Sequence, residues 1–153
     1  MIMDGPFERD IRIVIRDLLD ATSAFDGVYL SGPPEHRGER GGDLRAAAIE
    51  PGETAASSCW DDVSGPLVRT ARATIILMAR DDDPQTRDEV AEQLLETTIA
   101  ALDGRSLAGR TLPEWTGIRS WTWRKPTPPE RRIEALLEFR YLVEDRVDAD
   151  PTP

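Results

Sequence analysis

The sequence is poor in the side chains that carry most enzyme and metal chemistry. Cysteine occurs once, as Cys59, and histidine once, as His36. A single cysteine can form neither an internal disulfide nor a thiolate metal cluster, so we expect Cys59 to be a small buried apolar residue. These shortages predict no enzyme activity, no metal site and no cofactor. Chemistry by carboxylates alone, for example by Asp62 with Glu114, is an alternative that the sequence leaves open.

Long apolar runs are also missing. No window of 18 apolar residues occurs, and the first residues have neither a basic nor an apolar signal region. The sequence therefore predicts no membrane-spanning helix and no secretory signal. At 153 residues the chain has the size of one domain with a single core. We expect that domain over residues 1–147, followed by a disordered tail at 148–153.

Basic charge is scarce relative to acidic charge. The 29 Asp and Glu residues outnumber the 19 Lys and Arg residues, which gives a net charge of −10. General nucleic-acid binding is not expected, because it requires clustered cations, whereas an acidic surface lets DNA pass without adhering. Lys125 is the only lysine, and this composition resembles that of proteins from a halophilic or GC-rich host. A high-salt host predicts that stability changes between low and molar salt, where self-repulsion is screened.

Two helices are predicted from the spacing of apolar residues. The first covers residues 7–21 and the second covers residues 87–102. In the first helix, the apolar stripe consists of Phe7, Ile11, Val14, Leu18 and their neighbours Ile15 and Leu19. In the second, the stripe expected to pack on a sheet consists of Ala91, Leu94, Leu95, Thr98 and Leu102. Gly104 is placed as the glycine that ends the second helix.

Three consecutive aspartates, Asp81, Asp82 and Asp83, precede the second helix. Pro84 suits a first helical turn, and the segment Thr86 to Glu89 fits a capping box. The aspartates would also favour the positive end of the helix dipole. A divalent-metal site is the alternative interpretation. It is disfavoured because consecutive side chains cannot all point at one ion, and because the glycine and distal glutamate of a calcium loop are missing.

Alternating patterns predict strands at residues 28–30, 44–49, 68–80 and 118–124. Pro51-Gly52 is expected to end the second of these strands, and residues 55–66, with Trp60 as a lid on the core, are expected to be irregular. Residues 68–80 form the most regular pattern. Ala71, Ala73, Ile75, Leu77 and Ala79 share one face of it, and the opposite face becomes apolar at Ile76 and Met78. This strand is therefore expected to be central and covered on both sides in its middle.

Two features near the end of the chain each allow two structural interpretations. Trp121 and Trp123 share one face of the strand at 118–124, which indicates either packing or a contact with another subunit. Residues 131–144 fit a helix or a strand. We prefer a strand at 134–143, because the strand pattern gathers two aromatic residues and one β-branched residue on one face.

Residues 31–43 form a long stretch with four glycines and two prolines, typical of a loop. A phosphate-binding loop is disfavoured there, because no strong strand precedes it and no Gly-Lys-Ser/Thr follows it. His36 is expected to be a solvated side chain within this loop.

The order of these elements resembles the tail terminator (tail-completion, minor tail) protein family of long-tailed viruses of bacteria and archaea and of related gene transfer particles. The resemblance covers residues 7–144. Its most similar parts are residues 70–80 before the helix at 87–102, and the run at 137–143. The loop at 31–43 and the strand with Trp121 and Trp123 depart from the family pattern.

The resemblance implies a single α+β domain, with a mixed, mainly antiparallel sheet flanked by an N-terminal helix and a second helix. It implies a virion protein, assembled in the host cytoplasm, that forms a hexameric ring at the neck end of the tail. The ring would stop polymerisation of the tail tube protein and join the tube to the neck connector, while DNA passes through its lumen without specific binding. A head-tail connector or a small soluble binding module are the alternatives, and neither involves a membrane.

This function would place several residues at interfaces with neighbouring subunits or at the lumen. We expect the acidic turn before the second helix, the loop at 31–43 and three of the tryptophans to lie there. The candidate interface residues are Glu35, His36, Arg37, Asp81, Asp82, Asp83, Trp115, Trp121 and Trp123.

Overall fold

The computed structural model describes residues 5–30, 43–56 and 68–142. The predictions at Glu35, His36, Arg37, Cys59 and Trp60, and the predicted disordered tail, lie outside these residues. The elements are α1 (Gly5–Asp20), β1 (Gly27–Tyr29), β2 (Leu44–Ala56), β3 (Val68–Arg80), α2 (Pro84–Leu102), the short 3-10 helix η2 (Pro113–Trp115), β4 (Gly117–Trp123) and β5 (Glu130–Leu142).

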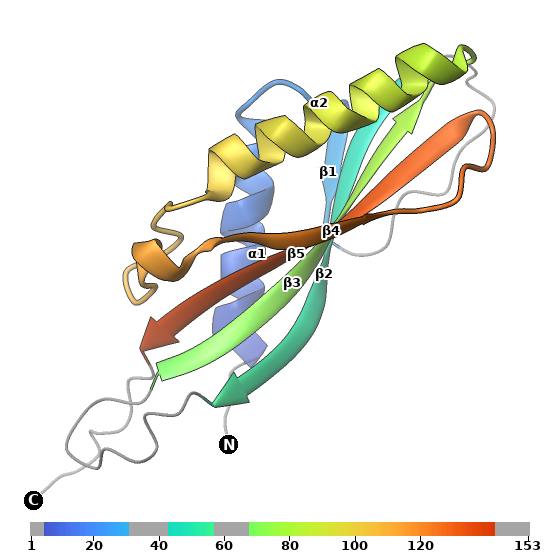
Figure 1. Cartoon of the computed structure of the whole chain (residues 1–153). Helices are drawn as coiled ribbons and strands as arrows, with labels where there is room; N and C mark the ends of the chain where they lie inside the picture. Colours follow the sequence, from blue (N-terminus) through green and yellow to red (C-terminus); the bar gives the residue numbers. More distant parts are fainter. Residues whose placement is uncertain (1–4, 31–42, 57–67, 143–153) are drawn as a thin grey trace, which may run out of the picture.

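The five strands form one twisted sheet in the order β1-β2-β3-β5-β4 (Figure 1). β1 pairs with β2 in parallel, and the other described pairs are antiparallel. The predicted α+β class with a mixed, mainly antiparallel sheet and two helices is therefore confirmed. Neither described helix has the length and apolar character needed to cross a membrane.

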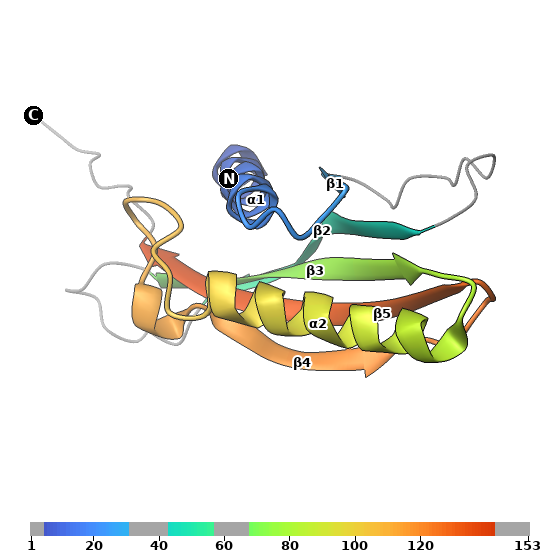
Figure 2. The same cartoon turned by 90° about the horizontal axis from the view of Figure 1, so that it is seen from above.

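The core lies between one face of the sheet and the two helices. α1 contributes Ile11, Ile15 and Leu19, and α2 contributes its predicted stripe. The sheet contributes alternate residues of β3 and β5: Ala71, Ala73, Ile75, Leu77, Ala79, Ile133, Ala135, Leu137, Phe139 and Tyr141. We call this the helix face of the sheet. Figure 2 shows α2 lying along β5 and α1 lying toward the β2 side.

β3 is the central strand, as its pattern predicts. Its residues on the helix face are buried, and so are Ile76 and Met78 in the middle of the opposite face. Ala46 and Ala48 of β2 pair with Met78 and Ile76 and are also buried. We call this second side of the sheet the open face, because both described helices pack against the other one.

β2 corrects one prediction, because it does not end at Pro51-Gly52. It continues to Ala56 and stays paired with β3, with a shift in register between Pro51 and Thr54. Proline is tolerated at bulges and on edge strands. Both conditions hold here, since β1 covers β2 only at Ala46, Ala47 and Ala48 among the described pairs.

The start of α2 corrects a second prediction. The N-cap is Asp83 rather than Thr86, and the helix begins at Pro84. The Asp83 carboxylate accepts hydrogen bonds from the Thr86 backbone N–H at 3.0 Å and from the Thr86 hydroxyl at 2.7 Å. The helix ends as predicted, with Gly104 at φ 69° just after the C-cap residue Asp103.

The cap at Asp83 predicts a pH-dependent contribution to stability. The hydroxyl and then the N–H of Thr86 hold the pKa of Asp83 below its ordinary value. The contribution is therefore present above the unfolded pKa of about 3.9 and is lost as pH falls through the folded pKa. We expect Asp83→Ala to lower the melting temperature by a few degrees at neutral pH, and the difference from wild type to shrink in acid. Asp83→Asn, which keeps an acceptor oxygen, serves as the control.

β5 confirms the preference for a strand near the end of the chain. It begins at Glu130, four residues earlier than predicted, because β3 pairs with it along all 13 residues from Arg80↔Glu130 to Val68↔Leu142. The expected aromatic face is buried, with Phe139 and Tyr141 each 2% exposed.

Candidate assembly surface

β4 is an edge strand of the sheet. Among the described strands it pairs with β5 alone, so one side of its backbone has no strand partner. Every residue from 119 to 129, which covers most of β4 and the connection to β5, is exposed. Figure 2 shows β4 as the outermost strand, with α2 beside it. An unpaired edge of this kind is a template for pairing with another chain.

Trp121 and Trp123 are exposed on this edge, by 47% and 36%. They pair with Ala135 and Ile133, so they share the helix face of the sheet. The interpretation that both rings pack in the core is wrong, because both are exposed on the edge strand of the sheet. Their role in a subunit contact stays a prediction.

Arginine side chains lie over two of the exposed tryptophan rings. The Arg131 guanidinium lies 4.8 Å from the ring centre of Trp123, and its Nε lies 4.0 Å from a carboxylate oxygen of Asp88 in α2. Arg140 lies 4.0 Å from the ring centre of Trp115, which is 42% exposed. Cation–π contacts of this kind hold a ring in one orientation while leaving its outer face accessible.

Cations line the same edge. Arg119 and Arg124 point to the open face, where they pair with Glu138 at 3.3 Å and with Glu134 at 3.1 Å. Lys125 follows in the connection to β5 and forms no ion pair with a described residue. The exposed stretch from 119 to 129 therefore carries three cations and no acidic residue.

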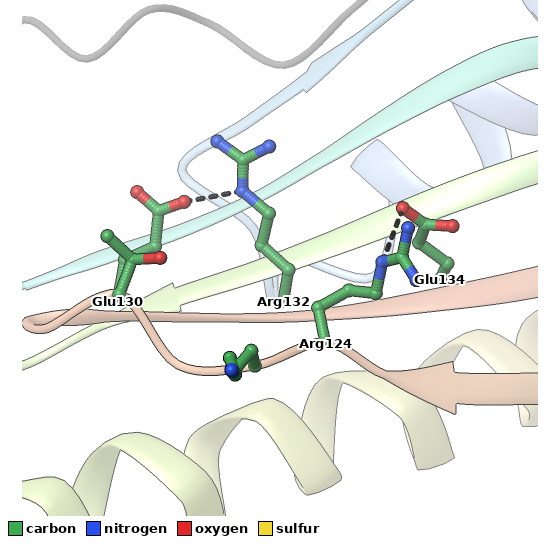
Figure 3. Close-up of a pocket in the computed structure, with 6 residues that line it drawn as sticks. Arg124, Glu130, Arg132 and Glu134 are labelled. Carbon is green, nitrogen blue, oxygen red and sulfur yellow. Dashed lines mark hydrogen bonds and ion pairs between the residues drawn. The ribbon is translucent and has the colours of Figure 1, made fainter.

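A shallow hollow of about 400 Å³ lies where this connection meets the open face. Figure 3 shows Arg124 paired with Glu134 and Arg132 paired with Glu130 along it. The lining side chains are Arg124, Lys125, Thr127, Glu130, Arg132 and Glu134. Small-molecule sites are mostly apolar, with a few polar groups. A hollow lined by paired charges is better suited to a protein surface.

The predicted acidic turn lies next to this edge. The backbone N–H of Asp81 donates to the carbonyl of Pro129 in the β4–β5 connection at 3.0 Å. The Asp81 carboxylate accepts from the backbone N–H of Asp83 at 2.9 Å, so two of the three aspartates make local hydrogen bonds. Within the described part of the chain, no group of three or more His, Cys, Asp or Glu side chains is placed to hold a metal ion.

The outer face of α2 continues the acidic surface, a feature that the sequence analysis missed. Glu89, Glu92 and Glu96 are exposed at helical spacings of three and four. The same spacing that identified the buried stripe identifies this one when it is applied to charge.

The exposure of Trp121 predicts a small effect on the stability of the isolated chain. Trp121→Ala is expected to lower the free energy of unfolding by about 0.5–1 kcal/mol, because exposed side chains contribute little to stability. Leu137→Ala, on the neighbouring strand but fully buried, is expected to cost about 2–5 kcal/mol. Urea denaturation of both variants measures the contrast, and equal losses would contradict the exposed placement of Trp121.

Comparisons with known proteins show what this fold is similar to. No protein-family model matches the sequence, and no curated protein matches it. Among solved structures, a chain of the virion of a native gene transfer agent particle matches with a TM-score of 0.57 and 16% sequence identity. The match covers 86% of this chain and 94% of that one. At this level of identity the likeness shows a shared fold.

Proposed function

We propose that the chain is a structural protein of a phage-like particle. In this proposal it forms a hexameric ring at the head-proximal end of the tail tube, stops tube polymerisation and joins the tube to the neck connector. The observation that carries the proposal is the fold likeness to a gene transfer agent virion chain, which extends over almost the whole of both chains.

The surface of the chain supports assembly with copies of itself. β4 offers an unpaired strand edge with two exposed tryptophans, and aromatic residues are enriched at the anchors of protein interfaces. A contact between two different surfaces of the same chain closes into a ring when the rotation permits it.

The charge of the chain supports a lumen that DNA crosses. The net charge is −10, and the turn before α2 exposes Asp82 and Asp83 to solvent. Carboxylates repel phosphate, so a ring that turns this surface inward would let DNA slide without binding it. Which surface faces the lumen is part of the proposal.

The proposal is tested by the mass and shape of the purified chain and by its position in a particle. Light scattering and negative-stain microscopy are expected to show a six-fold ring with an open centre. Antibody labelling of purified particles is expected to mark the end of the tail tube next to the head. Labelling of the neck beyond the tube end would favour the head-tail connector, and a chain that stays monomeric and never caps tubes would favour a small binding module.

A further inference from the structure

We infer that copies of the chain join through a contact between the β4 edge of one copy and the acidic outer face of α2 of the next. The edge contributes Arg119, Trp121, Trp123, Arg124 and Lys125. The helix contributes Glu89, Glu92 and Glu96. The inference rests on the proposed function for the existence of the ring, and it identifies the two surfaces that meet.

Charge complementarity points to a second copy as the partner of the edge. Residues 117–129 carry three cations and no carboxylate, whereas the outer face of α2 exposes three glutamates at successive turns. The one arginine within α2, Arg87, is 7% exposed and pairs with Asp88 at 3.1 Å, so it does not neutralise those glutamates. One surface of the chain thus supplies the charge that the other lacks.

No ion pair among the described residues joins the two surfaces within one chain. α2 buries Ala91, Leu94 and Leu95 against the sheet, so Glu92 and Glu96 point away from it. β4 ends the sheet at its side. Both surfaces are therefore available to a neighbouring copy, and a contact between two unlike surfaces is the kind that closes into a ring.

In the isolated chain, the helix surface carries charges that repel one another, and the edge surface contributes little to stability. Like charges at spacings of three and four destabilise a helix, and no described cation pairs with Glu92 or Glu96. Arg124 is 54% exposed in its pair with Glu134, and a pair this exposed contributes little to stability. Bringing the edge to the helix would relieve the repulsion and remove the tryptophan faces from water.

DNA is a weaker candidate for the edge. Tight phosphate binding requires many clustered cations. The edge carries three cations, and two of them, Arg119 and Arg124, are already paired with Glu138 and Glu134. The two exposed tryptophan rings on the same strand suit a protein surface with apolar area better than a uniformly charged polymer.

Reversal of charge on each surface tests the contact. The edge variant is Arg124→Glu with Lys125→Glu, and the helix variant carries Glu89→Lys, Glu92→Lys and Glu96→Lys. Each alone is expected to need at least a tenfold higher concentration to assemble than wild type, because the two surfaces then carry the same sign. An equal mixture of the two variants, and one chain carrying both sets of changes, are expected to regain assembly. Light scattering at low salt, where screening is weak, gives the mass in each case.

Controls separate a failed contact from a failed fold. All of the changed residues are exposed, so circular dichroism and melting of both variants should match wild type. Arg9→Glu with Arg16→Glu on α1 changes the net charge as much as the edge variant and is expected to leave assembly intact. Trp121→Ala with Trp123→Ala is expected to weaken assembly without unfolding the chain.

The outcomes distinguish this contact from the proposed function. A wild-type ring that persists unchanged in both reversed variants would overturn the contact and leave the proposed function standing. A wild-type chain that is monomeric at every concentration would overturn the proposed function, and the contact with it. A mixture that regains only a two-chain species would support the contact and contradict the ring.

Discussion

Replacement of Phe139 by alanine is expected to lower the free energy of unfolding by about 3–5 kcal/mol, the largest effect of a single substitution that we predict. Phe139 is 2% exposed, and its ring centre lies 6.2 Å from that of Tyr141. Tyr141 in turn lies 4.6 Å from the ring of Phe7 and donates a hydrogen bond from its hydroxyl to Glu8 at 2.8 Å. Truncation of Phe139 therefore leaves a cavity beside the contact that holds α1 to β5.

Leu136→Ala is the control for this substitution. Leu136 lies on the same strand but on the open face, where it is only partly buried. Its truncation is expected to cost less than half as much as that of Phe139. Urea denaturation followed by circular dichroism measures both losses, and comparable values would contradict the full burial of Phe139 and the partial exposure of Leu136.

The central strands could be predicted because the order of apolar and polar residues along each strand depends on which of its faces are buried. One face of β3 is apolar along the strand, and the other face is apolar only in its middle. This pattern is typical of a strand that is covered on both faces there. The sequence of β5 fits a helix nearly as well as a strand. The strand was preferred because it places Phe139 and Tyr141 on one face. Its first four residues were missed because Glu130, Arg131 and Arg132 carry charge; their strand conformation follows from pairing with β3.

The cap of α2 shows how local rules can compete. Asp83 and Thr86 are each a good N-cap residue, and Thr86 also has Glu89 three positions later, as a capping box requires. Only one of these two residues can be the N-cap of α2. Pro84 decides for Asp83, because proline is best accommodated in the first turn and its missing N–H costs nothing there.

The candidate surface depends on sheet order, which the sequence does not state. β4 and β5 form an antiparallel pair. From the sequence, either of the two strands could have paired with β3. Because β5 takes the inner position, β4 becomes the edge, and Trp121 and Trp123 become exposed. With the opposite order the same two rings would lie toward the core. The sequence therefore identified Trp121 and Trp123 as candidate contacts but could not decide between packing and contact.

Gly52→Ala is expected to lower the free energy of unfolding by about 1–3 kcal/mol, although Gly52 is exposed. A Cβ atom at Gly52 would lie 2.7 Å from the backbone carbonyl oxygen of Arg72 on β3. Because that neighbour is backbone, it can move only if the pairing of β2 with β3 shifts at the bulge after Pro51. Gly109→Ala is the matched control, since no atom lies within 4 Å of its added Cβ, and it should be neutral or slightly stabilising. An equal response of the two variants to urea would show that β2 does not continue past Pro51 with the observed pairing. Gly52, which the sequence pattern places at the end of a strand, is thus expected to be required for β2 to continue to Ala56.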